Sequence, residues 1–204
     1  MRAAINKQEL LEKCRLLLLE MLGTERGGKA YRSFELSYDA LLTKESSEET
    51  KGELPQMREI VLRTIALYQA LLKIKISWQQ TEEILKALMK GYAVLMSREL
   101  ERLSSTPFFF ANYRKKVAEG YSDYFSEKEW DIELIENTRS KLCFDIKACL
   151  FFDVLKANDC VILAPLFCEF EKTVFEGMED KVGFSRPYYK GKGDDYCELS
   201  FYKV

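Results

Sequence analysis

The stretch VGFSRPYYKGKGDDYCELSFYKV, residues 182–204, decides the fold class. Residues 182–186 and 197–201 alternate apolar with polar or small side chains, as half-buried strands do. The segment between them is rich in glycine and aspartate, which are typical of tight turns. The pattern predicts two antiparallel strands joined by a hairpin turn.

A two-residue turn at Gly191-Lys192 fits the preference for glycine at the first position of a type II′ turn. That turn predicts one coherent buried face, with the pairs Val182–Phe201, Phe184–Leu199 and Arg186–Cys197. Arg186 and Cys197 then point inward, and a buried guanidinium requires a partner. The candidates for that partner are a ligand carboxylate, Asp153, Glu171 and Asp194.

The acidic pair Asp194-Asp195 has two interpretations. Aspartate commonly stabilises turns because its side chain bonds to nearby backbone, and Cys197 is commonly a core residue. The stretch is a site as well as a hairpin if its inward face meets Cys168 and Glu171. Those two residues are three positions apart and share a helix face.

Residues 126–204 combine strands with helices. WDIEL (130–134) has a period of two and predicts a strand. CFDIKACLFFDVLKAND (143–159) is predicted to be helical for most of its length, with Asp153 facing solvent. Pro165 suits the first turn of a further helix over 165–178.

Residues 1–125 are predicted to be mainly helical. Apolar residues recur at three- and four-residue intervals over 6–23, 57–74 and 81–103, and an aromatic-rich helix follows over 108–125. Helix boundaries are indicated by Gly23, Pro55 and a Ser77–Gln80 capping box. We expect one α+β domain, 1–204, with a helical N-terminal part followed by a small antiparallel sheet with packed helices.

The composition excludes several classes of protein. Lys and Arg (31) nearly balance Asp and Glu (33), so the net charge is −2 and nothing indicates binding to nucleic acid or an anionic membrane. The apolar runs are far shorter than the ~20 residues that span a bilayer, and the residues after Met1 lack a signal-peptide core. We expect a cytoplasmic protein with no nucleic-acid or membrane partner.

Histidine is absent from the chain. Its absence excludes Ser-His-Asp and Cys-His catalytic sets and any His-ligated metal, so acid–base chemistry falls to carboxylates, Lys, Tyr or Cys. The cysteines show no Cys-x2-Cys spacing, so we expect free thiols and no metal or other cofactor. They are Cys14, Cys143, Cys149, Cys160, Cys168 and Cys197.

Several of these residues occur together in a recognisable order: Cys149, Cys168 with Glu171, Phe184 with Arg186, then Gly193, Asp194 and Cys197 with Leu199. This order resembles the C-terminal portion of the L-2-amino-thiazoline-4-carboxylic acid hydrolase family. Three positions depart from the family pattern: Glu171 replaces Asp, Pro187 replaces Thr and Leu199 replaces Phe. Pro187 removes a hydroxyl group and a backbone donor beside Arg186.

The resemblance implies a hydrolase of cysteine metabolism that opens a carboxylated thiazoline ring by C–S cleavage and yields N-carbamoyl-L-cysteine. This reaction needs a base near the attacking water, an acid near the leaving sulfur and a cation for the substrate carboxylate. Arg186 is the expected substrate-binding cation because guanidinium binds carboxylate at two points, and Cys149 is the second expected substrate-binding residue. Two catalytic alternatives stay open: Glu171 or Asp194 as base, or Cys168 or Cys197 as nucleophile.

Two other interpretations compete with a hydrolase. The layout also resembles vinyl-4-reductase-type ligand-binding domains, which predicts a non-catalytic sensor with a large apolar cavity. A third interpretation is an interaction module that forms a homo-oligomer through an exposed apolar face on residues 55–103. An enclosed pocket where Arg186 meets two carboxylates would favour the hydrolase, with a small molecule as its partner.

Overall fold

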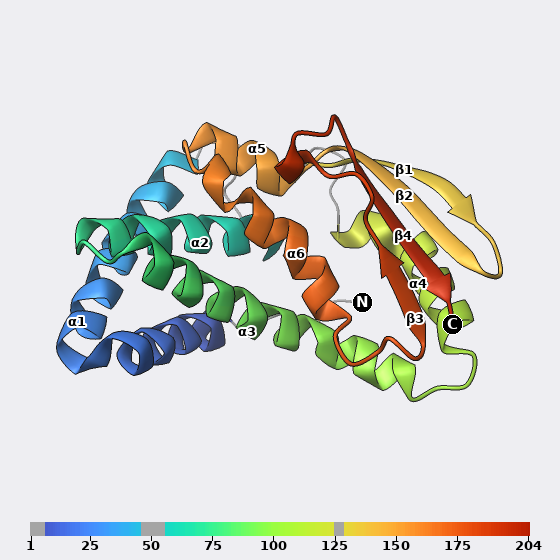
Figure 1. Cartoon of the computed structure of the whole chain (residues 1–204), viewed down its shortest axis with the longest axis horizontal. Helices are drawn as coiled ribbons and strands as arrows, with labels where there is room; N and C mark the ends of the chain where they lie inside the picture. Colours follow the sequence, from blue (N-terminus) through green and yellow to red (C-terminus); the bar gives the residue numbers. More distant parts are fainter. Residues whose placement is uncertain (1–6, 46–55, 125–128) are drawn as a thin grey trace.

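The computed structural model describes residues 7–45, 56–124 and 129–204, and it has a helical part beside a small sheet (Figure 1). The helical part contains α1 (Lys7–Glu45), α2 (Gln56–Lys73), α3 (Trp78–Ser104) and α4 (Phe109–Tyr124). The elements that follow are β1 (Asp131–Asn137), β2 (Lys141–Ala148), α5 (Leu150–Ala157), η2 (Val161–Leu163), α6 (Ala164–Val174), β3 (Val182–Ser185), η3 (Lys190–Lys192) and β4 (Cys197–Lys203). This architecture confirms the predicted α+β class, while the assignment of the whole chain to one domain stays a prediction.

The first helix is longer than the sequence predicted. Gly23 was expected to end it, and Gly23 does leave the helical conformation (φ 75, ψ 170), which glycine adopts readily. The chain then continues as a second helical arm to Glu45, so that α1 forms a bent pair of arms (Figure 1). The second arm is stabilised by apolar side chains at helical spacing, since Ala30, Phe34 and Leu41 are buried.

Two further helix boundaries confirm the sequence predictions. The Ser77 hydroxyl accepts a hydrogen bond from the Gln80 amide at 3.3 Å and caps α3, and Pro165 lies in the first turn of α6. The helix boundary predicted at Pro55 lies outside the described residues. None of the helices in the described ranges combines the length and apolar character that a membrane crossing requires.

A buried polar cluster joins α1 to α2. Glu59 accepts hydrogen bonds from the Arg63 guanidinium at 2.6 Å and from the Tyr38 hydroxyl at 3.0 Å. The Arg63 guanidinium also lies over the Tyr38 ring, 4.8 Å from its centroid. Arg63 and Glu59 are only 2% and 5% exposed, so each charge depends on the other for compensation.

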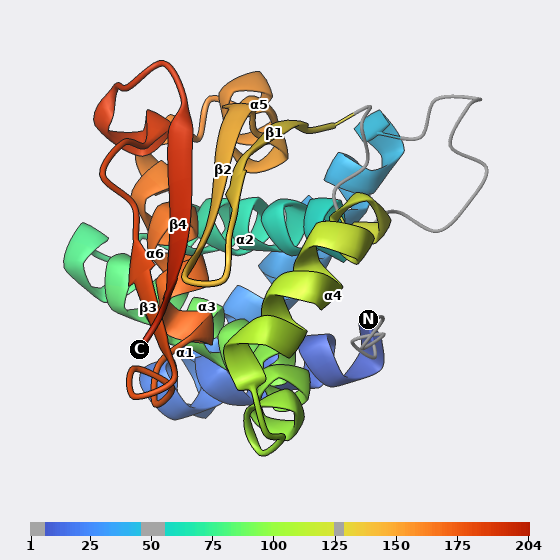
Figure 2. The same cartoon turned by 90° about the vertical axis from the view of Figure 1, so that its right-hand side faces the viewer.

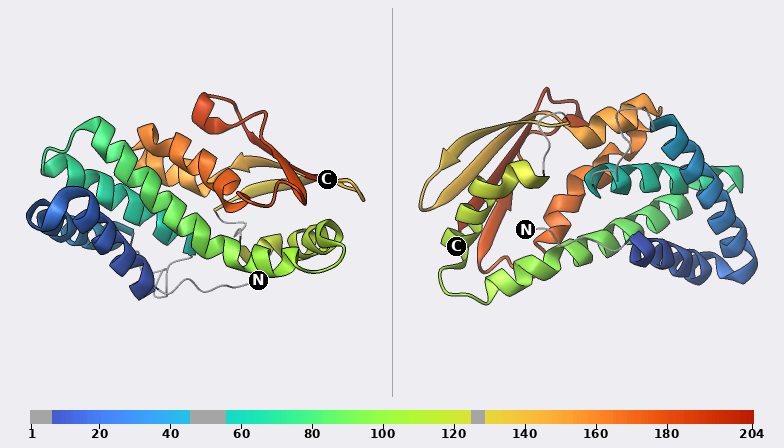
Figure 3. Two further views of the ribbon diagram at one scale, coloured as in Figure 1. Left: turned by 60° about the horizontal axis from the view of Figure 1, so that its bottom comes forward. Right: turned by 180° about the vertical axis from the view of Figure 1, so that it is seen from behind.

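The sheet has four antiparallel strands in the order β1-β2-β4-β3. Leu142, Phe144 and Ile146 of β2 are paired with Phe201, Leu199 and Cys197 of β4, and all six side chains are buried. Figure 2 and Figure 3 show the helices gathered on one side of the sheet. Two rings, Tyr113 of α4 and Phe175 at the end of α6, contact Phe201 on this face. The inward face of the sheet is therefore covered by α4 and α6.

The predicted hairpin register is wrong. Phe184 is paired with Phe201 and Val182 with Lys203, so β3 is shifted by two residues along β4, and β3 ends before Arg186. The cause is the connection, which contains η3 and a left-handed Gly193 (φ 102) in place of a two-residue turn. A shift of two residues keeps the same side chains on the same face, so Phe184 still packs inward.

The helix predicted over 143–159 is also wrong in its first third. Residues 141–148 form β2, and α5 begins only at Leu150. Phe144 and Ile146 are buried while Asp145 and Lys147 between and after them are not, which is the alternation of a strand, and the continuous apolar run of the helix starts later. The sequence interpretation gave the apolar run too much weight and missed the alternation that precedes it.

The Glu59 cluster gives a prediction about stability. Replacement of Glu59 by Ala leaves the buried Arg63 without its carboxylate, so the free energy of unfolding should fall by about 3–5 kcal/mol. Tyr38→Phe removes a single hydrogen bond to the same carboxylate and should cost about 1 kcal/mol. Urea unfolding of both variants measures the difference, and equal small losses would show that the pair does not need mutual compensation.

Candidate functional site

A small cavity lies where α5, α6 and the β3–β4 loop meet. Its volume is about 30 Å³, which is room for one or two water molecules. Its apolar wall is aromatic: Phe151 stands edge-on to Trp130 at 5.3 Å between ring centroids and packs against Phe167 at 4.9 Å. The apolar wall lowers the polarity of the surroundings and so strengthens any charge interaction beside it.

Three cysteines and one arginine meet at this cavity. Cys149 lies between β2 and α5, Cys168 lies in α6, and Cys197 begins β4. Arg186 directly follows β3. The four residues are far apart in sequence. They come together because α5 and α6 pack beside one end of the sheet (Figure 1), where β2 and β3 end and β4 begins. All three cysteines are free thiols.

The Arg186 guanidinium is held against α6. Its Nη1 donates a hydrogen bond to the backbone carbonyl of Cys168, and its central carbon lies 5.6 Å from the centroid of the Phe184 ring. Burial lowers the pKa of Arg186, and the thiols of Cys168 and Cys197 act against that shift. A guanidinium stays charged at neutral pH, so the cavity contains a fixed positive charge.

Burial raises the pKa of two cavity thiols, Cys149 and Cys168, and keeps them protonated. It raises the pKa of Cys149 to about 12, although the backbone amides of Phe152 and Phe151 act in the opposite direction. Burial also raises the pKa of Cys168, and the Arg186 charge opposes this increase. Since the thiolate is the nucleophilic form of cysteine, neither residue is an activated nucleophile before a ligand binds.

The β3–β4 loop forms the roof of the cavity. Lys190 and Gly191 line it, and the Lys190 amide donates to the Cys197 sulfur at 3.4 Å. A Cβ atom added at Gly191 would lie 2.8 Å from the Cys168 sulfur, so only glycine allows this close approach. The Asp194 carboxylate accepts a hydrogen bond from the Tyr189 amide at 2.8 Å and closes the turn.

The structure thus brings together four of the six predicted site residues: Cys149, Cys168, Cys197 and Arg186. Asp194 stabilises the loop and does not line the cavity. Glu171 lies one helical turn beyond Cys168 in α6, but its side chain is outside the described part of the structure. Asp153 is exposed, as predicted.

Sequence reasoning missed Trp130, Phe152, Lys190 and Gly191 at the cavity. For Lys190 and Gly191 a signal was present, because both lie next to the predicted turn and close in sequence to Arg186. Trp130 and Phe152 carried no such signal, since they reach the cavity only through tertiary packing. Among the described residues, no three Cys, Asp or Glu side chains are grouped as metal ligands.

A family model matches most of the chain. The model of the family described as L-2-amino-thiazoline-4-carboxylic acid hydrolase matches residues 56–201, from the start of α2 to the middle of β4. The match therefore extends well beyond the C-terminal stretch that carried the resemblance. The search of curated proteins found no match. Since the matched region covers most of the chain, this protein belongs to the L-2-amino-thiazoline-4-carboxylic acid hydrolase family.

Proposed function

We propose that the protein is a hydrolase that opens a small carboxylated thiazoline-type ring by C–S cleavage and yields N-carbamoyl-L-cysteine. The observation that carries this proposal is the meeting of Cys149, Cys168, Cys197 and Arg186 at one cavity in a chain of this family. Arg186 supplies a cation for the substrate carboxylate. The aromatic wall supplies an apolar surface for the ring.

The lining favours a thiol as the attacking group. None of the cavity-lining residues in the described part of the chain carries a carboxylate, whereas three carry thiols. In this route the cysteine sulfur bonds to the ring carbon between nitrogen and sulfur, and its proton passes to the ring nitrogen. The ring C–S bond then breaks and leaves a thiolate, which takes up a proton. Water next attacks the same carbon, supplies the urea oxygen and restores the enzyme thiol.

The other catalytic alternative is direct attack by water with Glu171 or Asp194 as base. Asp194 would have to break its bond to the Tyr189 amide to take this part. The sensor interpretation anticipates a large apolar cavity, whereas the cavity here is about 30 Å³ and contains Arg186. A cytoplasmic location, a homo-oligomer and independence from cofactors stay predictions.

The first test is turnover of L-2-amino-thiazoline-4-carboxylate, followed by mass spectrometry. We expect a product one water heavier than the substrate, and about a hundred-fold lower kcat/KM in Arg186→Met, which lacks the carboxylate cation. Cys168→Ser and Cys197→Ser distinguish the thiols. If one of them is the nucleophile, its variant should lose turnover while the other retains it.

Cys143→Ser is the matched control, because Cys143 is a buried thiol on the opposite face of the sheet. Its sulfur accepts a hydrogen bond from the Ser200 hydroxyl at 3.1 Å. It should retain full turnover. A wild-type protein that binds the substrate without releasing the heavier product would contradict the hydrolase and favour the sensor. Equal activity in all the cysteine variants would instead favour direct attack by water.

The raised pKa of Cys149 predicts a dependence of stability on pH. Its pKa is about 12 in the folded protein against 9.0 for a free thiol, so the folded state holds the proton more tightly. The contribution of the Cys149 thiol to the free energy of unfolding is therefore fully present below pH 9, and it is lost as the pH rises toward 12. Compared with Cys149→Ser, the wild type should lose roughly 1 kcal/mol more per pH unit in this window. Urea unfolding at increasing pH measures the difference, and parallel curves would contradict it.

A further inference from the structure

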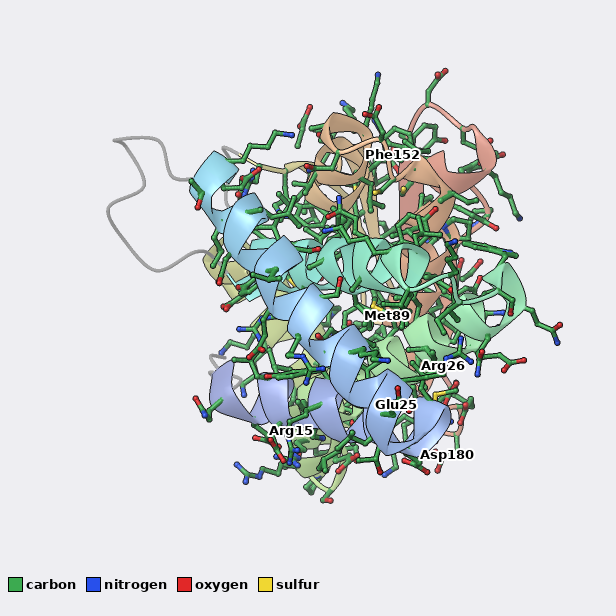
Figure 4. The ribbon with its side chains drawn as sticks, turned by 90° about the vertical axis from the view of Figure 1, so that its left-hand side faces the viewer. Arg15, Glu25, Arg26, Met89, Phe152 and Asp180 are labelled. Carbon is green, nitrogen blue, oxygen red and sulfur yellow. The ribbon has the colours of Figure 1, made fainter. Side chains whose placement is uncertain are left out.

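Lys190 is a second cation at the cavity. Together with Arg186 it makes both charged residues of the lining positive, and the described part of the lining contains no carboxylate. The Lys190 ammonium lies 5.9 Å from the centroid of the Phe152 ring, and Figure 4 labels Phe152 on α5. Lys190 forms no ion pair with any described residue of the chain. The described lining of the cavity therefore carries only positive charge, with Lys190 at its edge.

The loop that carries Lys190 is held by hydrogen bonds among its own residues, and its tip is attached to the rest of the protein by weaker contacts. Within the loop, the Tyr189 amide donates to Asp194 at 2.8 Å and the Lys192 amide donates to the Tyr189 carbonyl at 2.9 Å. Near its base, the loop is bonded to β4, because the Glu198 amide donates to the Tyr188 carbonyl at 3.0 Å. Its tip, residues 190–192, touches the body through the Lys190 amide–Cys197 sulfur bond, the Gly191 amide–Cys168 sulfur bond and the Lys190–Phe152 contact. Hydrogen bonds to thiol sulfur are weak, so the tip can lift without loss of its own fold.

The closed cavity is too small for the ligand that its chemistry suits. Its volume is about 30 Å³, whereas pockets for small organic ligands are roughly 300–1,000 Å³. The aromatic wall belongs to α5, α6 and the residue before β1, which are packed into the core. The loop is the part of the lining with the weakest attachments, and its displacement would enlarge the cavity.

We propose that Lys190 is a specificity-determining residue that selects ligands bearing a carboxylate, and that the 187–196 loop lifts from Cys168 to admit them. The inference takes its ligand class from the proposed function, but it does not depend on turnover. Arg186 is fixed to the Cys168 carbonyl, whereas Lys190 moves with the roof. The second positive charge therefore reaches the ligand when the loop closes.

The test compares two reagents that differ in charge. Iodoacetate and iodoacetamide both alkylate thiols, but only iodoacetate carries a carboxylate. We expect Lys190→Met to lower the iodoacetate rate at Cys168 and Cys197 by about ten-fold relative to iodoacetamide, because one cation near the reagent is lost. Peptide mass spectrometry assigns each alkylated cysteine. High salt should reduce the preference of the wild type more than that of the variant, which retains only the Arg186 charge.

Lys192→Met is the matched control. Lys192 is on the same loop but lies over the Tyr189 ring, 4.4 Å from its centroid, and does not line the cavity. It should keep the wild-type ratio of the two rates. Equal ratios in both lysine variants would overturn the assignment of Lys190.

Gly191→Ala tests the movement of the loop. The added Cβ would lie 2.8 Å from the Cys168 sulfur and push the tip away, so both reagents should alkylate Cys168 faster. Unchanged or slower alkylation would overturn the role of the loop as a roof. A wild-type protein that fails to turn over the thiazoline but shows the Lys190-dependent ratio would refute the hydrolase and retain this inference.

Discussion

The arrangement of the cavity depends on how closely the β3–β4 loop approaches α6. Glycine at position 191 allows the backbone to lie against the Cys168 sulfur, and the Arg186 side chain binds the carbonyl of the same cysteine from the start of the loop. The Arg186 bond holds the end of β3 beside α6, and this sets the distance between the sheet and α6. That distance in turn decides which side chains share the cavity, because Cys149 and Cys197 are placed by the strands and Cys168 by the helix.

The region matched by the family model begins at α2 and includes every element that lines the cavity. α1 lies outside this region, yet its Tyr38 hydroxyl binds the buried Glu59 of α2. The helices α1 to α4 form the helical layer. Within it, α3 packs against α6 and α2 packs against α5. The helical layer therefore acts on the cavity only indirectly, as the support that keeps α5 and α6 pressed toward the sheet. This division explains why no side chain that the structure describes in α1 to α4 lines the cavity.

Local signals in the sequence predicted much of the fold. The Ser77 cap, Pro165 and the alternation in residues 182–185 and 197–201 each reflect interactions within a few residues, and each was interpreted correctly. The register of the hairpin depends on the whole connection, in which Gly193 adopts a left-handed conformation, and this was not evident from the glycines alone. Trp130 and Phe152 could not be predicted as neighbours of Arg186, because their positions result from the packing of α5 against the end of the sheet. Cys149, Cys168 and Cys197 were grouped by their order in the chain, and tertiary packing accounts for their proximity.

The position of Cys149 has a consequence for how this protein can change. It occupies the N-cap of α5 with an extended backbone, and its sulfur, a weak acceptor, offers the Phe151 and Phe152 amides a poorer cap than a hydroxyl would. Serine is among the preferred residues at such a position, and a proper cap contributes about 1 kcal/mol. Selection for stability alone would thus favour serine over cysteine there and remove one of the three thiols. At the N-cap of α5, the residue that gives the higher stability is therefore different from the residue that supplies a thiol to the cavity. Variants selected for heat resistance alone would tend to lose the Cys149 thiol.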